Sequence, residues 1–168
     1  MKASKRAVAV VVNGWTILGG TLFLDQIERL DTAARAEEPH YSGSVQGPNT
    51  KLLAHLLHLA FHVIPEKPES PSFRQGKTLG PAYSHWRRAK TGNGRYRLSF
   101  RFSTRQRIIV YAWVNDSSTL RTYGRRDDAY AVFARMLDSG NPPDDWDALV
   151  RGASTEEGRK RLKQLGGG

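Results

Sequence analysis

The sequence contains no cysteine and no long apolar run. The lack of cysteine excludes disulfide bonds, thiolate catalysis and cysteine-ligated zinc. The apolar stretch 7–12 follows Lys2, Lys5 and Arg6, as in a signal peptide, but it is too short and has no small-residue cleavage site. No other stretch approaches membrane-spanning length. We therefore expect a soluble protein of the cytoplasm that does not associate with a membrane.

Acidic residues are scarce in the middle of the chain. The 168 residues include 26 Lys and Arg against 16 Asp and Glu, a formal net charge of +10. Residues 74–126 hold 13 of the basic side chains and only one acid, Asp116. Because a field this local attracts polyanions, nucleic acid is the first candidate partner.

Hydrophobic periodicity predicts an α+β domain over residues 1–151. Helices are expected at 21–36, at 51–63 with Asn49 or Thr50 as cap, from a cap at Asp127 or Asp128 to Leu137, and at 144–150. Strands are expected at 6–18, with a bend at Asn13-Gly14, and as three antiparallel strands within 86–126. The apolar run 108–114 suits a strand buried on both faces. The charged tail, 152–168, is expected to be frayed.

Residues 95–103 alternate strictly between two kinds of side chain, the signature of a half-buried strand. One side carries Arg95, Arg97, Ser99, Arg101 and Ser103; the other carries Tyr96, Leu98, Phe100 and Phe102. We expect the aromatic side to face a core and the arginine side to face solvent or a ligand. A single exposed arginine is ordinary solvated surface, so only the clustering of these residues indicates a site.

The turn sequence 91–94, Thr-Gly-Asn-Gly, predicts a hairpin. A four-residue loop would oppose Lys90 to Arg95 and Arg88 to Arg97 on one face. Like charges opposed across strands destabilise the folded state, so an anionic ligand is expected to offset them. The following hairpin, turning near 103–106, would bring Asn115 and the segment up to Tyr123 beside the same cations.

The chain lacks paired carboxylates, a Ser-His-Asp order and a phosphate-cradling glycine motif. His55, His58 and His62 share a helical face, but without a carboxylate pattern they are expected to border a helix interface rather than to bind a metal. His85 is a weaker acid/base candidate. RNA cleavage needs no metal: clustered arginines can bind phosphate, and Tyr123 beside Arg121 could serve as the base.

This hypothesis predicts that alanine at Arg88 or at Arg97 abolishes RNA cleavage while leaving the fold intact. Cleavage of labelled RNA by each variant is the measurement, and full retained activity would refute the hypothesis.

Several strings of residues resemble the YhaV toxins of the RelE/ParE superfamily of type II toxin–antitoxin systems. They are NGW (13–15), TKLLA (50–54), SPSFRQGKTLG (70–80), WRRAKTGNGRYRLSFRF (86–102), NDSSTLRTYGRRDDAYAVFARML (115–137) and GNPPDDW (140–146). The resemblance implies a RelE-like α+β fold, with N-terminal helices on a twisted antiparallel sheet and C-terminal helices added. It also implies an endoribonuclease that cuts mRNA at the ribosome and inhibits translation, without a metal or other cofactor. The tail beyond Arg151 lies outside the resemblance.

By the same resemblance, the partner is a PrlF-type swapped-hairpin antitoxin that also contacts operator DNA. The site maps to the basic face of the sheet, with the segment from Asn115 adjoining. The catalytic candidates are Arg88, Arg95, Arg97, Arg121 and Tyr123. The candidate substrate-binding residues are Lys77, Lys90, Arg101, Asn115, Asp116 and Arg125.

Two other functions remain open at this point. The superfamily also includes ParE-like toxins directed at DNA gyrase, because one fold hosts both activities. A non-catalytic nucleic-acid-binding co-repressor is the second; it would bind operator DNA in a salt-dependent manner without cleaving it. Mapping of cut ends on labelled mRNA, with and without ribosomes, separates these functions.

Overall fold

The computed structural model describes residues 9–76, 79–91, 94–115 and 128–166. It is an α+β protein built on one five-stranded sheet in the order β1-β2-β5-β4-β3. The strands are β1 (Val10–Val12), β2 (Trp15–Gly19), β3 (Arg87–Thr91), β4 (Tyr96–Ser103) and β5 (Ile108–Val114). The helices are α1 (Thr21–Glu37), α2 (Pro48–His58), α3 (Ala129–Asp138), α4 (Trp146–Ala153) and α5 (Glu156–Gly166).

The prediction of a wholly antiparallel sheet is wrong, because the sheet is mixed. β1 and β2 form an antiparallel hairpin at Asn13 and Gly14, which have φ angles of 50° and 79°. β2 then pairs in parallel with the central strand β5. The parallel pairing arises because α1, α2 and the β3–β4 hairpin all intervene between β2 and β5 in the chain. β3, β4 and β5 are antiparallel to one another, as predicted.

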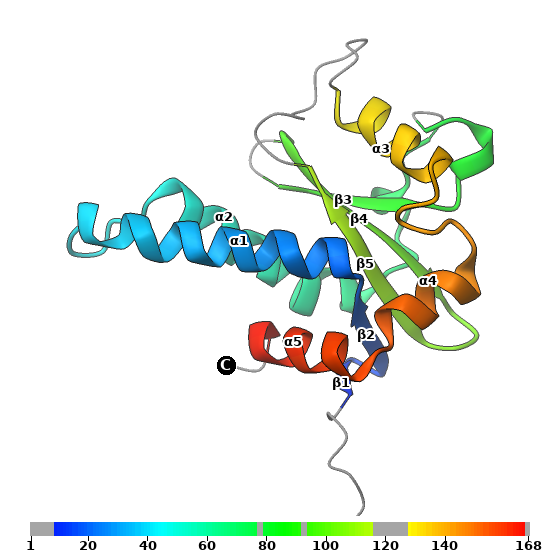
Figure 1. The fold of residues 1–168 in the computed structure, drawn as a ribbon, viewed down its shortest axis with the longest axis horizontal. Coiled ribbons are helices and arrows are strands. Elements are labelled where there is room, and N and C mark those ends of the chain that lie inside the picture. Colours follow the sequence, from blue (N-terminus) through cyan, green and yellow to red (C-terminus); the bar gives the residue numbers. More distant parts are fainter. Residues whose placement is uncertain (1–8, 77–78, 92–93, 116–127, 167–168) are drawn as a thin grey trace, which may run out of the picture.

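Helices cover both faces of the sheet (Figure 1). On one face, apolar side chains of α1, α2 and α5 pack on Leu98 and Phe100 of β4. On the other face, α3 and α4 pack on Trp86 and on β5 residues such as Val110. β5 is therefore buried on both sides, as the uninterrupted apolar run predicted.

The two N-terminal helices lie side by side and extend away from the sheet (Figure 1). Their connection is held by Glu37, whose carboxylate accepts hydrogen bonds from the Thr50 N–H at 2.8 Å and the Asn49 side-chain amide at 3.0 Å. Asn49 and Thr50 are thus inside α2 rather than at its cap, a correction to the expected start. The N-cap is Gly47, which precedes Pro48. Proline suits the first turn of a helix because its missing N–H would be unpaired there.

The C-terminal segment expected to be frayed contains α5. Leu162 is only 1% exposed and packs in the same cluster as α1 and α2. Arg161 donates hydrogen bonds of 2.7 Å to both Asp25 and Glu28 of α1. The high charge of this segment therefore belongs to the outer face of an amphipathic helix. No helix within the described ranges has the length and apolar character needed to cross a membrane.

The ion pairs of Arg161 predict a pH-dependent contribution to stability. The hydrogen bond from Arg161 lowers the pKa of Glu28, so this stabilisation is present above the carboxylate's unfolded pKa and is lost as the pH falls. We expect Arg161→Gln to lower the free energy of unfolding at pH 7 by at most about 1 kcal/mol, because the carboxylates are partly exposed. The difference should be smaller at pH 3 than at pH 7.

Urea unfolding at both pH values measures this effect. Lys163→Gln is the matched control, since it removes the same charge from an exposed position of the same helix. A loss for Arg161→Gln that is equal at pH 7 and pH 3 would contradict the ion-pair explanation.

Candidate functional site at the end of the β3–β4 hairpin

The β3–β4 hairpin brings four of the predicted cations together, in a different register from the predicted one. Lys90 is opposite Arg97, and Arg88 is opposite Ser99. The predicted pairs, Arg88 with Arg97 and Lys90 with Arg95, are therefore wrong by two residues. Because side chains alternate with a period of two, this shift keeps the predicted residues on the same face.

Asn115 contributes to this register. Its side-chain oxygen accepts a hydrogen bond from the Arg97 N–H at 2.6 Å, and its amide nitrogen donates to the Arg95 carbonyl at 2.8 Å. Asn115 is 2% exposed and directly follows β5. Its side chain thus lengthens the β4–β5 pairing by one step and ties Arg95 and Arg97 to the central strand. The expectation that Asn115 lies beside these cations is confirmed.

Two guanidinium groups converge on the hydroxyl of Tyr130 in α3. The Nε atoms of Arg88 and Arg97 donate to this oxygen at 3.0 and 3.1 Å. The Arg97 guanidinium also lies over the Tyr130 ring, 5.4 Å from its centroid, and donates to the Gly94 carbonyl. Arg88 donates to the Ser72 carbonyl at 2.8 Å. Both arginines are therefore held in fixed orientations.

The cations of the site differ in exposure. Lys90 and Arg95 are exposed, Arg88 is half-buried, and Arg97 is only 5% exposed. The prediction that the whole arginine side of β4 faces solvent or a ligand is wrong for Arg97, because α3 covers it. Among the described residues, no carboxylate pairs with Arg97. Exposed positive charge thus lies beside a buried cation whose hydrogen-bond acceptors are neutral.

Arg101 lies apart from this group, further along β4. Its guanidinium sits between the rings of Trp86 and Trp146, at 5.6 and 5.3 Å from their centroids, and donates to the Asp144 carbonyl. Burial lowers the pKa of Arg101, although Asp144 and Asp145 oppose that shift. The structure therefore does not bring Arg101 together with Lys90 and Asn115, the other predicted substrate-binding residues that it describes.

His85 lies near Arg101, and both residues contact Asp144. Its Nε2 lies 2.6 Å from the Asp144 carboxylate, which also accepts the Trp86 ring N–H at 2.8 Å. Burial alone would raise the pKa of Asp144, but the hydrogen bonds from Trp86 and His85 and the nearby charges lower it. This arrangement ties α4 to the start of β3, on the Arg101 side of the sheet.

The three helical histidines are exposed, so the expectation that they border a helix interface is wrong. The rings of His58 and His62 lie against each other, tilted by 30° and with centroids 5.3 Å apart. Within the described ranges, no group of three or more His, Asp or Glu side chains could hold a metal ion.

Five predicted site residues lie outside the described residues: Lys77, Asp116, Arg121, Tyr123 and Arg125. The described residues on either side of 116–127 both adjoin the site. Asn115 binds the backbone of Arg97, and Asp128 caps α3 by accepting the Tyr130 N–H at 3.1 Å. Asp128 was predicted as one of two possible caps, and this is confirmed.

Tyr130 is the residue that the sequence reasoning missed. It was part of a predicted helix, and its position in the first turn after the Asp128 cap was the available signal. An aromatic residue with a hydroxyl, placed next to a basic segment, needs a hydrogen-bond partner when it is buried.

An α+β protein with exposed cations around rigidly held arginines is suited to binding a polyanion. Comparison with known families then identifies the chain more closely. Residues 17–154 match the family described as "Toxin with endonuclease activity, of toxin-antitoxin system". The chain belongs to this family, the YhaV toxins, and is an endonuclease toxin of a toxin–antitoxin system.

Curated relatives agree with the family match. The chain is 41% identical over 151 residues to the ribonuclease toxin YhaV of Escherichia coli K12, covering 87% of this chain and 95% of the relative. The same identity and coverage hold for toxin YhaV of Escherichia coli O157:H7. No solved structure gives a significant match. The endonuclease description favours a nuclease over the gyrase-directed and co-repressor alternatives.

The shared hydroxyl predicts a stability effect for Tyr130→Phe. The ring remains in place, but the Nε atoms of Arg88 and Arg97 lose their acceptor in a mostly buried position. We expect the free energy of unfolding to fall by roughly 1.5–3 kcal/mol, the range for hydrogen bonds to charged groups. Urea unfolding of the purified variant is the measurement.

Tyr83→Phe is the control for this variant, because it also removes one tyrosine hydroxyl. That hydroxyl donates to Asp138 at 2.5 Å near the surface, so its loss should have a much smaller effect. If the two substitutions lower the free energy of unfolding equally, the two arginine hydrogen bonds contribute no more to stability than an ordinary surface hydroxyl.

Proposed function

We propose that this toxin is an endoribonuclease that cuts mRNA at the ribosome and thereby inhibits translation, on a RelE-like fold. The observation that carries the proposal is the convergence of Arg88 and Arg97 on one tyrosine hydroxyl, with Lys90 and Arg95 exposed beside them. The name of the relative from Escherichia coli K12, a ribonuclease toxin, supports RNA as the substrate.

The chemistry that suits this site is attack by the substrate's own 2′-hydroxyl. The 2′-oxygen forms a bond to the adjacent phosphorus, the bond from phosphorus to the 5′-oxygen breaks, and the products are a 2′,3′-cyclic phosphate and a 5′-hydroxyl. One proton leaves the 2′-oxygen and one reaches the departing 5′-oxygen. Cations held near the phosphate stabilise the extra negative charge that develops between these steps.

The differences in exposure suggest a division of roles. Lys90, Arg95 and the accessible part of Arg88 contact the phosphate groups. Arg97 is too deeply buried to do so and acts as a positioning residue, holding Tyr130 and the hairpin end. This revises its proposed role from catalysis to support. The earlier expectation that Arg97→Ala leaves the fold intact is revised with it.

The general base is proposed from the sequence alone. Tyr123, with Arg121 nearby in the chain, is the candidate, and Lys77, Asp116 and Arg125 are proposed as substrate contacts. All five lie outside the described residues. Support comes from the anchoring of Asn115 and Asp128, on either side of residues 116–127, beside the hairpin cations.

The antitoxin is proposed to be a PrlF-type swapped-hairpin protein, which also carries the toxin to operator DNA. Exposed cations such as Lys90 and Arg95 would attract an acidic antitoxin segment by the same electrostatics that attract RNA. A segment lying over these side chains would block access to the substrate.

The double variant Lys90→Gln with Arg95→Gln tests the proposed site. Both positions are exposed, so the fold should persist while phosphate contacts are lost. We expect mRNA cleavage to fall roughly a hundredfold or more, as for other losses of transition-state charge stabilisation. Sequencing of mRNA cut ends from translation reactions, with analysis for cyclic phosphate, is the measurement.

The matched control is Arg105→Gln with Lys160→Gln, which removes the same charge from exposed positions elsewhere. If cleavage falls equally in both double variants, the loss comes from the lower net charge of the protein and not from the Lys90/Arg95 site. Cleavage that persists in the Lys90/Arg95 variant would place the active site elsewhere.

A further inference from the structure

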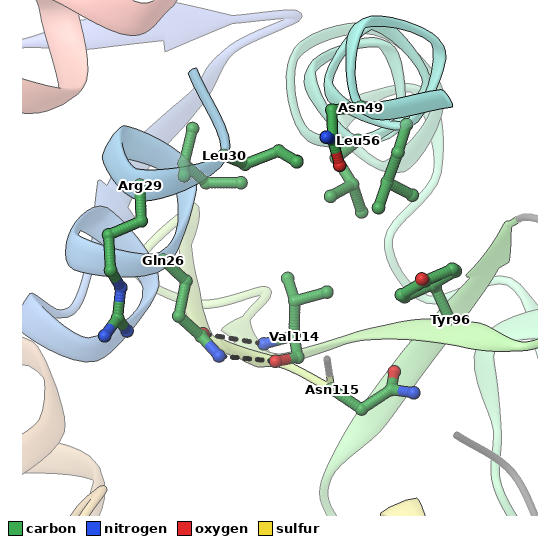
Figure 2. Close-up of a pocket in the computed structure, with 10 residues that line it drawn as sticks. Gln26, Arg29, Leu30, Asn49, Leu56, Tyr96, Val114 and Asn115 are labelled. Atoms are coloured by element: carbon green, nitrogen blue, oxygen red, sulfur yellow. Dashed lines mark hydrogen bonds between the residues drawn. The ribbon is translucent and has the colours of Figure 1, made fainter. Parts of the chain in front are cut away.

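A cavity of about 390 Å³ lies on the other side of β4 from the Arg97 side chain, between α1, α2 and the ends of β4 and β5. Figure 2 shows Val114 and Asn115 on one side of this space, with Leu30, Asn49 and Leu56 opposite. Tyr96 closes one end. Its size is that of a small-molecule site with apolar walls and a few polar groups.

Two amide side chains shape the cavity rather than offering it free hydrogen-bonding groups. Gln26 donates to the Val114 carbonyl at 2.5 Å and accepts from the Val114 N–H at 3.0 Å, as the dashed lines in Figure 2 show. Asn115 is engaged in the same way with the backbones of Arg95 and Arg97. These contacts fix the wall formed by the end of β5.

Three other side chains offer groups to a ligand. The amide nitrogen of Asn49 donates to Glu37, which leaves the Asn49 carbonyl oxygen as an acceptor. Arg29 is exposed and has no ion-pair partner among the residues that the structure describes. Tyr96 presents an aromatic ring at the cavity, and none of the lining residues is acidic. A flat, polar-edged heterocycle suits an aromatic ring with donors and acceptors around an apolar space.

The cavity adjoins the backbone of Arg95 and Arg97, while the Arg97 side chain lies on the opposite face of β4. Tyr96 lies between Arg95 and Arg97 in sequence, and Asn115 both lines the cavity and binds the backbone of those two residues. We propose that this cavity receives one RNA base next to the cut, with Tyr96 as its stacking surface, and so determines the sequence preference. This inference rests on the proposed ribonuclease function and extends it.

The test compares cut sites of the whole toxin and of Tyr96→Leu on a randomised mRNA library in a translation reaction. We expect the unmodified chain to prefer certain bases at one fixed position beside the cut. Tyr96→Leu should reduce that preference roughly fivefold or more, as expected from loss of base–aromatic stacking. Preferences elsewhere should stay unchanged.

Tyr41→Leu is the matched control, because Tyr41 is 40% exposed and lies outside the cavity. A second variant, Arg29→Gln, keeps the test usable if Tyr96→Leu does not fold, since Arg29 is exposed. Arg29→Gln should reduce the base preference at the same position beside the cut. A photoreactive base at the preferred position should also cross-link to the peptide that contains Tyr96.

Other results would overturn the inference. Cutting without any base preference, or an unchanged preference in Tyr96→Leu and Arg29→Gln, would show that the cavity reads no base. Unchanged cut sites combined with lost antitoxin binding would assign the cavity to the antitoxin. If the unmodified chain does not cut mRNA at all, the ribonuclease proposal fails first, and this inference falls with it.

Discussion

The Tyr130 hydroxyl is the contact on which the arrangement of the site depends. Two guanidinium groups that would repel each other donate to one neutral oxygen, and one of them is almost wholly buried. Burying a charge is costly unless it is hydrogen-bonded. Arg97 meets this requirement with the Tyr130 hydroxyl and the Gly94 carbonyl, and the ring of Tyr130 covers its face. Within the described residues, the acceptors of both guanidinium groups are neutral oxygens, and no carboxylate pairs with either arginine.

Local sequence patterns predicted most of the elements but not how they meet. Alternation along 95–103 placed Leu98 and Phe100 in a core, and the apolar run of β5 indicated its central position. The hairpin register was wrong because turn chemistry alone does not distinguish loops at 91–94 and 92–95. In the observed register, Asn115 binds the backbone of Arg95 and Arg97 from the end of β5, a long-range contact that the turn sequence does not indicate. The prediction that the C-terminal segment is frayed was wrong for a similar reason. The helix α5 is held by a long-range contact, the packing of Leu162 against α1 and α2.

The sequence predicted where the positive charge of the candidate site gathers, but it did not predict which side chains are exposed or what they contact. Counting cations located the hairpin, but exposure could not be read from alternation because α3 covers the arginine side of β4 near Arg97. Arg101 has the same residue type and strand face as Arg97, yet it lies between two tryptophans. Tyr130 could not be found from the strands, since it comes from a helix beyond them. Which arginine meets solvent is decided by packing between distant segments.

The division between rigid and exposed cations has a consequence for catalysis. Long exposed side chains such as Lys90 and Arg95 attract RNA from a distance, but their mobility and salt screening limit how accurately they place it. Accurate placement requires groups that are already fixed, and Arg88 is fixed by Ser72 and Tyr130. Because Arg95 directly precedes Tyr96, the first residue of β4, an RNA that passes around the hairpin end can place a phosphate at Arg95 and a base at Tyr96. Attraction, orientation and base selection can therefore all be served by one hairpin end.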